Sequence, residues 1–587
     1  MSGTPEQSAP ARAELSWSED GRPSSTAFGD MYFAADGLAE SRTVFLQGCG
    51  LPDTWSGRRR FTVAELGFGT GLNILALLQL WRDRRPAGGR LHIFSVEAFP
   101  LDPEEAARAL SSFPELGELA GPLLRRWPGR ARGFQRVDWP GLNAVLDIAT
   151  DEVGAALSAW DGPADAWFLD GFAPSRNPDM WRPEVLDLVR ARSASDARLA
   201  TFTVAGAVRR GLEAGGWTLS RRPGHGNKRE RLEARLSGGA PDRQTPARVQ
   251  ILGGGIAGAS LARAFARLGA SCTVIDTRPG AGASNNPAAL VAPRLDAGGG
   301  PVSRLAAQAF ARAAALYADE AGEAVIAGGA LRLASSAKDE VRFTSLAASG
   351  LFGPGSLSPL DAQGASGRLG EPSGPALWIA EALTVAPERA LSAWLAEAGR
   401  AERASDDAEL VCLASGAGAL DACEDLQAVA GQADWTDAEA LPGSAAGWGG
   451  YAVPTPGGGV LFGATHRRDV SDPVVTEEDS ARNLETLRSR LPELAARLDP
   501  SRLQARASVR VTTPDRLPLA GKLPDGRWIL SGLGGRGFTW APLLAEHVAA
   551  RALGAPSPLP RDLAELVDPE RFRRRAERRA PARARPA

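Results

Sequence analysis

The chain has 587 residues, and at about 100 to 200 residues per domain this length predicts about three or four compact units. Its 67 lysines and arginines nearly balance 69 aspartates and glutamates, so a globally basic nucleic-acid-binding protein is excluded and basic segments must be sought locally. The 4 cysteines form no C-x-x-C pair, which argues against a disulfide framework or a zinc site. Because there is no membrane-length apolar run and no signal-peptide core, we expect a cytoplasmic protein with no membrane segment and no metal.

A first glycine-rich turn follows an apolar strand in the segment FTVAELGFGTGLNILALLQLW, which starts at Phe61. The strand ends at Glu65, and a helix is expected from Leu72 after the alternate glycines Gly67, Gly69 and Gly71. Such glycines let the backbone pass close to a ligand. The next strand, 91–96, ends at Glu97, which is placed to bind a ribose. The pattern resembles the S-adenosylmethionine site of class I methyltransferases, and the alternative is an α/β unit with structural glycines.

Asp170 follows a predicted buried strand, Ala164 to Leu169, and opens the loop DGFAPSRNPDMW. In a doubly wound sheet, the carboxyl end of a strand is where ligands bind. A carboxylate there can orient a nucleophilic amine and accept its proton, and Phe172 can stack on a base or an ammonium group. The alternative role for Asp170 is to cap the following helix.

The end of the first half is locally basic. A strand is expected at 198–203 and a closing hairpin at 217–236, with GHGNKRER at its bend. Lys228 and Arg229 are candidate substrate contacts, since clustered basic residues are typical of phosphate-binding surfaces; a solvated basic face is the alternative. The Pro-, Gly- and polar-rich segment 237–247 predicts a linker, so we place the first domain at 1–240 and the end of the linker at 241–247.

The second half opens with RVQILGGGIAGASLARAFARLGASCTVID, from Arg248 to Asp276. Strands are expected at 249–252 and 272–275, with a helix between them from about Ser260. The first glycine allows a tight turn, the second admits a pyrophosphate, the third lets helix and strand pack, and the terminal acid can hold a ribose. The pattern Gly253, Gly255, Gly258 and Asp276 therefore predicts dinucleotide binding, against the alternative of a purely structural βαβ unit.

Later segments are expected to return to this cofactor. The loop 280–290 offers Ser284 and Asn286, and SGLGGRGF offers a last glycine turn that favours FAD over NAD, with the glycines Gly532, Gly534, Gly535 and Gly537. Arg510 and Arg536 are candidates to clamp a substrate carboxylate, with surface salt bridges as the alternative. We assign 248–570 to this domain, with a substrate subdomain at about 303–468, and treat the arginine-rich tail 571–587 as a disordered end or a phosphate contact.

Six motifs, in order along nearly the whole chain, resemble the family of bifunctional tRNA 5-methylaminomethyl-2-thiouridine biosynthesis proteins: ELGFGTGLN, FLDGFAPSRNPDMW, GNKRER, LGGGIAGASL, RVTTPDRLPLAG and LGGRGF. Tyr451 and 462–466 resemble family positions in the strands over the flavin, although such residues also serve in packing. One departure is Asn285, where the family usually has glycine; asparagine tolerates a left-handed backbone better than most residues.

The resemblance implies an α/β protein with a class I (Rossmann-like) methyltransferase domain, then an FAD-binding Rossmann domain with an interleaved α+β substrate domain. It implies that the flavin half removes the carboxymethyl group from 5-carboxymethylaminomethyluridine in tRNA. The methyltransferase half then methylates the freed amine with S-adenosylmethionine, with Asp170 as its orienting group and proton acceptor. Two alternatives stay open: a small-molecule amine oxidase fused to an N-methyltransferase, and a cofactor-holding tRNA scaffold without chemistry.

Overall fold

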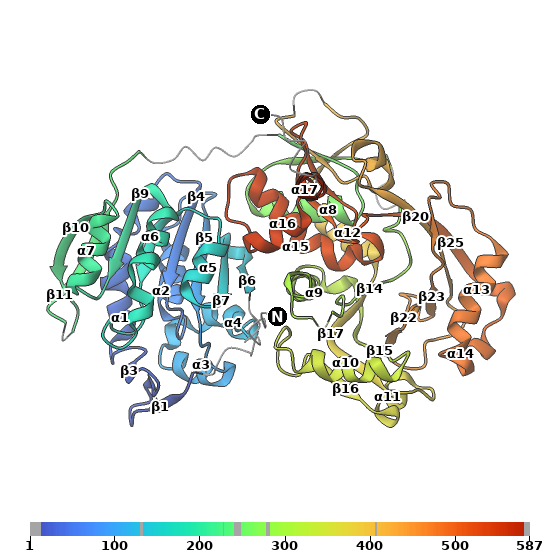
Figure 1. Cartoon of the computed structure of the whole chain (residues 1–587), viewed down its shortest axis with the longest axis horizontal. Coiled ribbons are helices and arrows are strands. Elements are labelled where there is room, and N and C mark those ends of the chain that lie inside the picture. The colour runs from blue at the N-terminus through green and yellow to red at the C-terminus, as the bar shows by residue number, and fades with distance from the viewer. Residues whose placement is uncertain are drawn as a thin grey trace. The chain divides into compact units, whose positions relative to one another are not determined.

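The computed structural model describes residues 13–129, 133–226, 228–239, 248–277, 282–296, 298–405 and 408–579, so the expected linker segment 241–247 lies outside them. The chain divides into two compact units (Figure 1): unit 1 is Met1–Gln244 with Gly554–Arg561, and unit 2 is Thr245–Leu553 with Asp562–Ala587. In the described ranges we find no helix with the length and apolarity needed to cross a membrane.

Unit 1 is built on an eight-stranded sheet in the order β10-β11-β9-β8-β4-β5-β7-β6. The central strand β4 (Arg60–Leu66) pairs in parallel with β5 (Arg90–Glu97) on one side and β8 (Ala164–Leu169) on the other. Strand order therefore reverses at β4, and this switch point is where doubly wound sheets bind ligands. The other strands are β6 (Gly133–Trp139), β7 (Ala144–Thr150), β9 (Ser193–Thr201), β10 (Thr218–Pro223) and β11 (Glu230–Arg235).

Helices cover both faces of this sheet (Figure 1) because alternate strand residues point to opposite sides. Val63 packs into the core under α2 (Leu72–Arg84), whereas its neighbour Ala64 packs into the core under α5 (Val153–Ala159). The remaining elements of unit 1 are β1 (Leu15–Trp17), β2 (Pro23–Ser25), β3 (Asp30–Met31), α1 (Gly37–Ser41), α3 (Pro103–Leu110), α4 (Gly117–Arg125), α6 (Pro183–Ala191) and α7 (Gly206–Ala214).

Unit 2 contains a six-stranded sheet in the order β18-β13-β12-β19-β27-β26. Its strands β12 (Val249–Leu252) and β13 (Cys272–Ile275) lie where the sequence predicted them, joined through α8 (Ile256–Arg267). The other strands are β18 (Gly399–Ala401), β19 (Leu410–Leu413), β26 (Leu519–Lys522) and β27 (Trp528–Ser531). A buried ion-pair network joins α8 to α9 (Pro301–Glu320) and α15 (Gly537–Ala552) through Arg263, Arg312, Glu320 and Glu546.

The second sheet of unit 2 has ten strands and extends beyond the predicted subdomain 303–468. It starts at β14 (Ala289–Val291) and ends at β25 (Gln504–Thr512), while β18 and β19 inside the predicted range pair with the first sheet. The reason is that the chain crosses repeatedly between the two sheets, and local periodicity does not reveal which sheet a strand joins. Its other strands are β15 (Val325–Leu333), β16 (Leu357–Leu360), β17 (Ala376–Val385), β20 (Gln427–Thr436), β21 (Ala445–Gly447), β22 (Tyr451–Pro454), β23 (Val460–Gly463) and β24 (Arg467–Arg468).

The end of the chain differs from the prediction in two ways. Residues 554–561 belong to unit 1, where the Ser557 amide donates to Asp161 at 2.9 Å, so the predicted domain 248–570 is interrupted. Arg571–Arg579, predicted to be disordered, forms helix α17, because Arg571 is buried and donates to Asp515 at 3.0 and 2.9 Å. The remaining helices are α10 (Ala337–Ala347), α11 (Ala362–Leu369), α12 (Pro387–Leu395), α13 (Glu477–Arg488), α14 (Pro492–Arg497) and α16 (Arg561–Val567).

Candidate active sites

The glycine turn of unit 1 has a backbone that only glycine adopts easily. Gly67, Gly69 and Gly71 have φ of +90°, +53° and +77°, in the region that costs other residues about 1–2 kcal/mol. A Cβ atom at Gly67 would lie 3.0 Å from the Gly171 backbone. The glycines of the turn between β4 and α2 therefore carry no side chains of their own, so a nucleoside cofactor can approach the backbone closely.

Asn73 joins the two strand-terminal acids of this site. Its Nδ2 donates to Glu65 Oε1 at 3.1 Å and to Asp170 Oδ2 at 2.8 Å, while its Oδ1 accepts from Ser41 Oγ at 2.6 Å. These bonds fix the orientation of the amide and hold Asp170 beside the glycine turn. Asn73 was not predicted from the sequence, although an amide in the first turn of an otherwise apolar helix is a usable signal.

The environment raises the pKa of both carboxyl groups. Burial raises the pKa of Glu65 well above its ordinary value, and desolvation raises the pKa of Asp170 to about 6. An acid with a pKa of about 6 is ionised at neutral pH yet holds a proton more tightly than an ordinary aspartate. Asp170 can therefore act as a proton acceptor for an amine.

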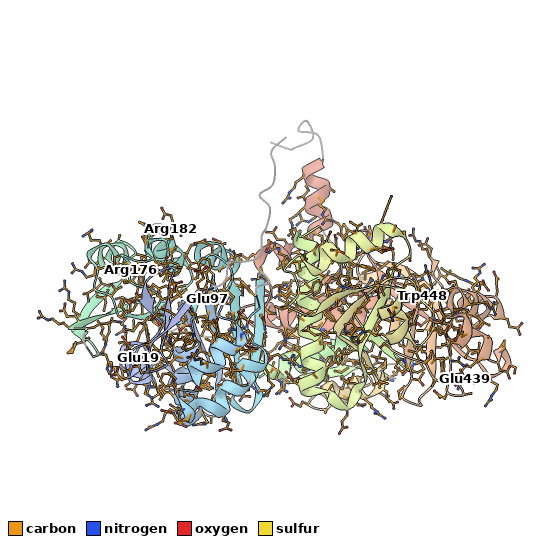
Figure 2. The ribbon with its side chains drawn as sticks, turned by 90° about the horizontal axis from the view of Figure 1, so that it is seen from below. Glu19, Glu97, Arg176, Arg182, Glu439 and Trp448 are labelled. Atoms are coloured by element: carbon orange, nitrogen blue, oxygen red, sulfur yellow. The ribbon has the colours of Figure 1, made fainter. Side chains whose placement is uncertain are left out.

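Glu97, labelled in Figure 2, ends β5 and anchors the glycine turn. Its Oε2 accepts from the Gly69 amide and its Oε1 from the Phe99 amide, both at 2.9 Å. Burial raises the pKa of this carboxyl group. Each oxygen keeps a second lone pair, so the predicted ribose contact is compatible with this anchoring role.

Aromatic rings line the segment next to Asp170. Phe172 stacks on Phe28 with ring centroids 4.8 Å apart, and Tyr32 meets Phe172 edge-on at 5.2 Å. Tyr32 also borders the glycine turn, because its Cδ1 lies 3.1 Å from where a Cβ of Gly69 would be. Phe28 and Tyr32 were not predicted from the sequence, because no local motif marks them.

The two predicted basic contacts differ in their surroundings. Lys228 pairs with Glu40 at 2.9 Å and lies over the Phe202 ring at 4.1 Å, and its charge lowers the pKa of Asp170. Arg229 is exposed on the hairpin. Lys228 is thus placed near the amine site, whereas Arg229 is placed at the surface.

The turn after β12 in unit 2 has the tight packing expected of a dinucleotide fingerprint. Gly253 has φ of +110°, and a Cβ there would lie 2.6 Å from the Ala414 carbonyl. A Cβ at Gly258 would lie 1.8 Å from the Gly253 carbonyl oxygen, so Gly258 allows close packing of helix and turn. Asp276 accepts from the Gly254 amide at 2.6 Å, and Ser284 Oγ accepts from the Ile256 amide at 3.0 Å.

A cavity of about 900 Å³ opens beside this turn. Its lining includes most of the predicted cofactor residues: Gly253, Gly255, Asp276, Ser284, Asn286, Gly532, Gly534, Gly535 and Gly537. The size and the glycine-bordered wall fit a flavin dinucleotide. Asn285 does not adopt a positive φ, so this loop does not require the glycine usual at that position. Arg536 is exposed and is not among the residues that line the cavity, although its neighbours Gly535 and Gly537 are, so its role as a carboxylate clamp stays a prediction.

Arg510, the other residue predicted to clamp a substrate carboxylate, lines the cavity. Its guanidinium donates to the Thr465 carbonyl at 3.2 Å and lies 3.4 Å from His466 Nε2, and burial lowers its pKa. Among the described residues it has no carboxylate within ion-pair distance. Tyr451 also lines the cavity, and burial raises the pKa of its hydroxyl. The positive charge of Arg510 is thus not neutralised by a nearby carboxylate, and the phenol of Tyr451 beside it is neutral. Together they favour an anionic ligand at this wall of the cavity.

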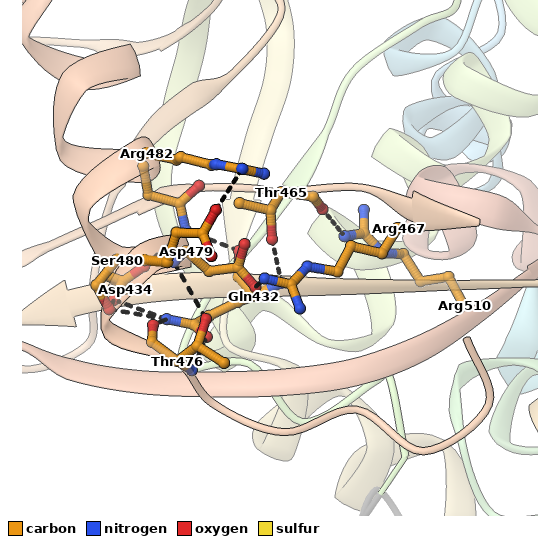
Figure 3. A network of polar contacts seen from close by, with 11 residues as sticks. Gln432, Asp434, Thr465, Arg467, Thr476, Asp479, Ser480, Arg482 and Arg510 are labelled. Atoms are coloured by element: carbon orange, nitrogen blue, oxygen red, sulfur yellow. Dashed lines mark hydrogen bonds and ion pairs between the residues drawn. The ribbon is translucent and has the colours of Figure 1, made fainter. Parts of the chain in front are cut away.

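A buried polar network holds this wall in place (Figure 3). The Gln432 amide donates to Thr465 Oγ1 at 3.0 Å, and the Thr465 amide donates to the Gln432 carbonyl at 3.1 Å. The Gln432 side chain donates to Ser480 Oγ at 2.8 Å, and Asn483 donates to Asp434 at 2.6 Å. The network therefore connects α13 through β20 to the carbonyl that positions Arg510.

Two family models match the chain. Residues 114–237 match S-adenosyl-L-methionine-dependent methyltransferases, and residues 248–551 match FAD dependent oxidoreductases. The tRNA 5-methylaminomethyl-2-thiouridine biosynthesis bifunctional protein MnmC of Caulobacter vibrioides is 53% identical over 583 residues, covering 96% of this chain and 98% of that protein. The chain belongs to the MnmC family.

Other MnmC proteins and one solved structure give further comparisons. The MnmC protein of Maricaulis maris is 43% identical, with 97% of each chain covered. A crystal structure of glycine oxidase from Geobacillus kaustophilus aligns with 53% of this chain and 95% of its own at 22% identity and a TM-score of 0.45. As an MnmC-family member, the chain combines an S-adenosylmethionine-dependent methyltransferase with an FAD-dependent oxidoreductase. Within the described ranges, no group of three or more His, Cys, Asp or Glu residues could hold a metal ion.

Proposed function

We propose that this protein performs two consecutive reactions on a wobble uridine of tRNA. The first removes the carboxymethyl group of 5-carboxymethylaminomethyluridine, with or without 2-thiolation, and leaves the aminomethyl form. The second methylates that amine to give 5-methylaminomethyluridine. The observation that carries the proposal is the similarity to MnmC proteins, which extends over 96% of the chain and so includes both sites.

In the oxidase site, the chain's own residues hold the substrate. Arg510 grips the carboxylate of the carboxymethyl arm, and Tyr451 beside it can donate its hydroxyl proton to the same group. The glycine turns would hold the flavin, which would supply a hydride acceptor for the carbon next to the nitrogen. Water then splits the resulting carbon–nitrogen double bond, which releases glyoxylate and leaves the primary amine. Positioning is the main contribution of the protein to this step.

In the methyltransferase site, Asp170 receives the freed amine. An alkylamine with a pKa of about 10 is mostly protonated at neutral pH and must lose a proton before it can attack a methyl group. The Asp170 carboxylate, held by Asn73, orients the ammonium group and accepts that proton. Phe172 and its aromatic neighbours offer a surface on which the uracil ring can stack. These reactions belong in the cytoplasm, with tRNA as the partner.

The test is nucleoside analysis by mass spectrometry after incubation with tRNA from a strain that lacks both activities. We expect conversion of carboxymethylaminomethyluridine to methylaminomethyluridine with S-adenosylmethionine, and a stop at aminomethyluridine without it. Turnover of free glycine derivatives with no change in tRNA would contradict the proposal. That result would favour a small-molecule amine oxidase fused to an N-methyltransferase.

A further inference from the structure

Arginines from separate segments of unit 2 gather beside the flavin cavity. The arginine cluster consists of Arg294 after β14, Arg332 on β15, Arg342 on α10, Arg490 after α13 and Arg536 in the last glycine turn. Arg342 donates to the Leu295 carbonyl, and Arg490 donates to the Ala334 carbonyl at 3.3 Å. These bonds connect α10 with the segment that carries Arg294, and Arg490 with the end of β15.

Strand register places Arg332 on the cavity face of the second sheet. Arg332 pairs with Gly447 of β21, and Gly447 pairs with Tyr451 of β22. Residues directly paired across neighbouring strands point to the same face, and Tyr451 lines the cavity. With strands about 4.8 Å apart, Arg332 lies roughly 10 Å from Tyr451 along the sheet.

Between Arg332 and the cavity, strand β21 presents a glycine and so no side chain of its own, and the nearest side chain is that of Leu290 in β14. Gly447 stands between them, and a Cβ there would meet its nearest neighbours only at 3.8 and 4.0 Å. On the other side, Arg536 lies between Gly535 and Gly537, which both line the cavity. A ligand that enters the cavity can therefore extend over Gly447 toward the arginine cluster, on a length scale comparable with one nucleotide.

The charges of the cluster are poorly compensated. Within the part of the chain that the structure describes, the side chains of Arg294, Arg332 and Arg536 form no hydrogen bond and no ion pair. Desolvation is the main cause that lowers the pKa of both Arg536 and Arg332. The charges of Arg332 and Arg294 lower the pKa of Arg536 further, and at Arg332 the charge of Asp339 raises the pKa while those of Arg342 and Arg490 lower it. Since the whole chain has a net charge of -2, this excess is a local feature and not a general basic character.

We propose that the arginine cluster binds phosphodiester groups of the RNA strand next to the nucleotide whose arm enters the flavin cavity. This rests on the proposed function and adds a phosphate site to it. Guanidinium groups match phosphate geometry, and bringing several together is unfavourable until an anion binds. A phosphate track also explains how a cavity sized for a flavin and a short arm can select a polymer, because affinity for RNA comes largely from backbone phosphates.

The experiment measures KM for the oxidase reaction of the full-length flavoprotein at several salt concentrations. Two substrates are compared: tRNA that carries 5-carboxymethylaminomethyluridine, and the free nucleoside. The variants are Arg294→Gln, Arg332→Gln and Arg342→Gln, singly and combined; Arg342 is exposed, so its replacement carries little risk to folding. The matched control is Arg488→Gln, an exposed arginine of α13 paired with Glu485 at 2.6 Å.

We expect the slope of log KM against log salt for tRNA to fall by about 0.7 to 0.9 for each phosphate contact removed. KM for tRNA should rise several-fold, KM for the nucleoside should change less, and the control should keep the wild-type slope. An unchanged slope in the combined variant would overturn the inference. An equal rise in KM for tRNA and for the nucleoside would also overturn it, because it would show that the arginines bind the substrate carboxylate and not the phosphates. If wild-type protein oxidises the nucleoside but not tRNA, the proposed function itself fails.

Discussion

Asp170 combines a raised pKa with a fixed position, and the two together predict a pH dependence. Desolvation raises its pKa to about 6, so the carboxylate needed as proton acceptor is lost as pH falls through about 6. We therefore expect the single-turnover rate of methyl transfer to aminomethyluridine in tRNA to decrease below pH 6, and Asp170→Asn to slow transfer at least about 100-fold. Asp179→Asn, on the exposed part of the same loop, is the control.

The ionised carboxylate of Asp170 is expected to have opposite effects on activity and on stability: it promotes methyl transfer but destabilises the fold. Because folding raises the pKa of Asp170, its ionised form disfavours the folded state, and this unfavourable contribution is present above about pH 6 and vanishes below its unfolded pKa. Asp170→Asn should therefore unfold at a higher temperature than wild type at pH 8, with the difference shrinking toward pH 4. A variant that is both slower and less stable at pH 8 would point to a structural role for this carboxylate.

At the scale of elements, the strand–turn–helix unit of β12 and α8 depends on Gly253. An alanine there would adopt φ of +110° and place its Cβ 2.6 Å from the Ala414 carbonyl. We expect Gly253→Ala to be purified with less than about a tenth of the wild-type flavin, because backbone strain of about 1–3 kcal/mol and the displaced turn both disfavour binding. Flavin absorbance per protein measures this. Gly300→Ala, where a Cβ meets nothing within 4 Å, should remain fully yellow.

The network between β20 and α13 predicts a second effect at this scale. Asn483 is buried and donates to Asp434 at 2.6 Å and to the Gln432 carbonyl at 2.9 Å. Asn483→Leu removes both donors and leaves buried acceptors unpaired, which should lower the free energy of unfolding of unit 2 by about 2–4 kcal/mol. Denaturant unfolding monitored by flavin release tests this. Thr486→Ala, at an exposed position on the same helix, should change stability by less than about 0.5 kcal/mol.

Strands could be predicted from the sequence where the residue types of a short segment determine them. The strands Val249–Leu252 and Ala164–Leu169 were located to the residue, because each is a short apolar run that ends at a glycine or an acid. Asn73, Phe28 and Tyr32 were missed because their roles depend on contacts between distant segments, which no spacing in the sequence records. Arg536 carried a plausible motif position, but whether its side chain lines the cavity depends on the turn around it, which no spacing in the sequence records; its neighbours Gly535 and Gly537 line the cavity and Arg536 does not.

At the scale of the whole molecule, the two reactions lie in separate compact units with separate cores. The acids and amide of the methyl-transfer site all come from unit 1, and the described residues that line the flavin cavity all come from unit 2. The residues identified in one site are therefore distinct from those identified in the other. The order of the reactions then follows from chemistry alone, since the amine that accepts the methyl group exists only after the carboxymethyl group has left.

Because the two sites use different residues, a variant of one site should block only its own reaction. Arg510→Gln removes the cation that we propose binds the substrate carboxylate, and losing a charge-assisted pair of hydrogen bonds of about 2–4 kcal/mol should reduce kcat/KM of the oxidase reaction about 30- to 1000-fold. The same variant should methylate tRNA that already carries aminomethyluridine at the wild-type rate, whereas Asp170→Ala should accumulate aminomethyluridine with flavin reduction unchanged. Nucleoside mass spectrometry reads both outcomes. If Arg510→Gln also slowed methylation of the preformed amine, the sites would be coupled and their independence refuted.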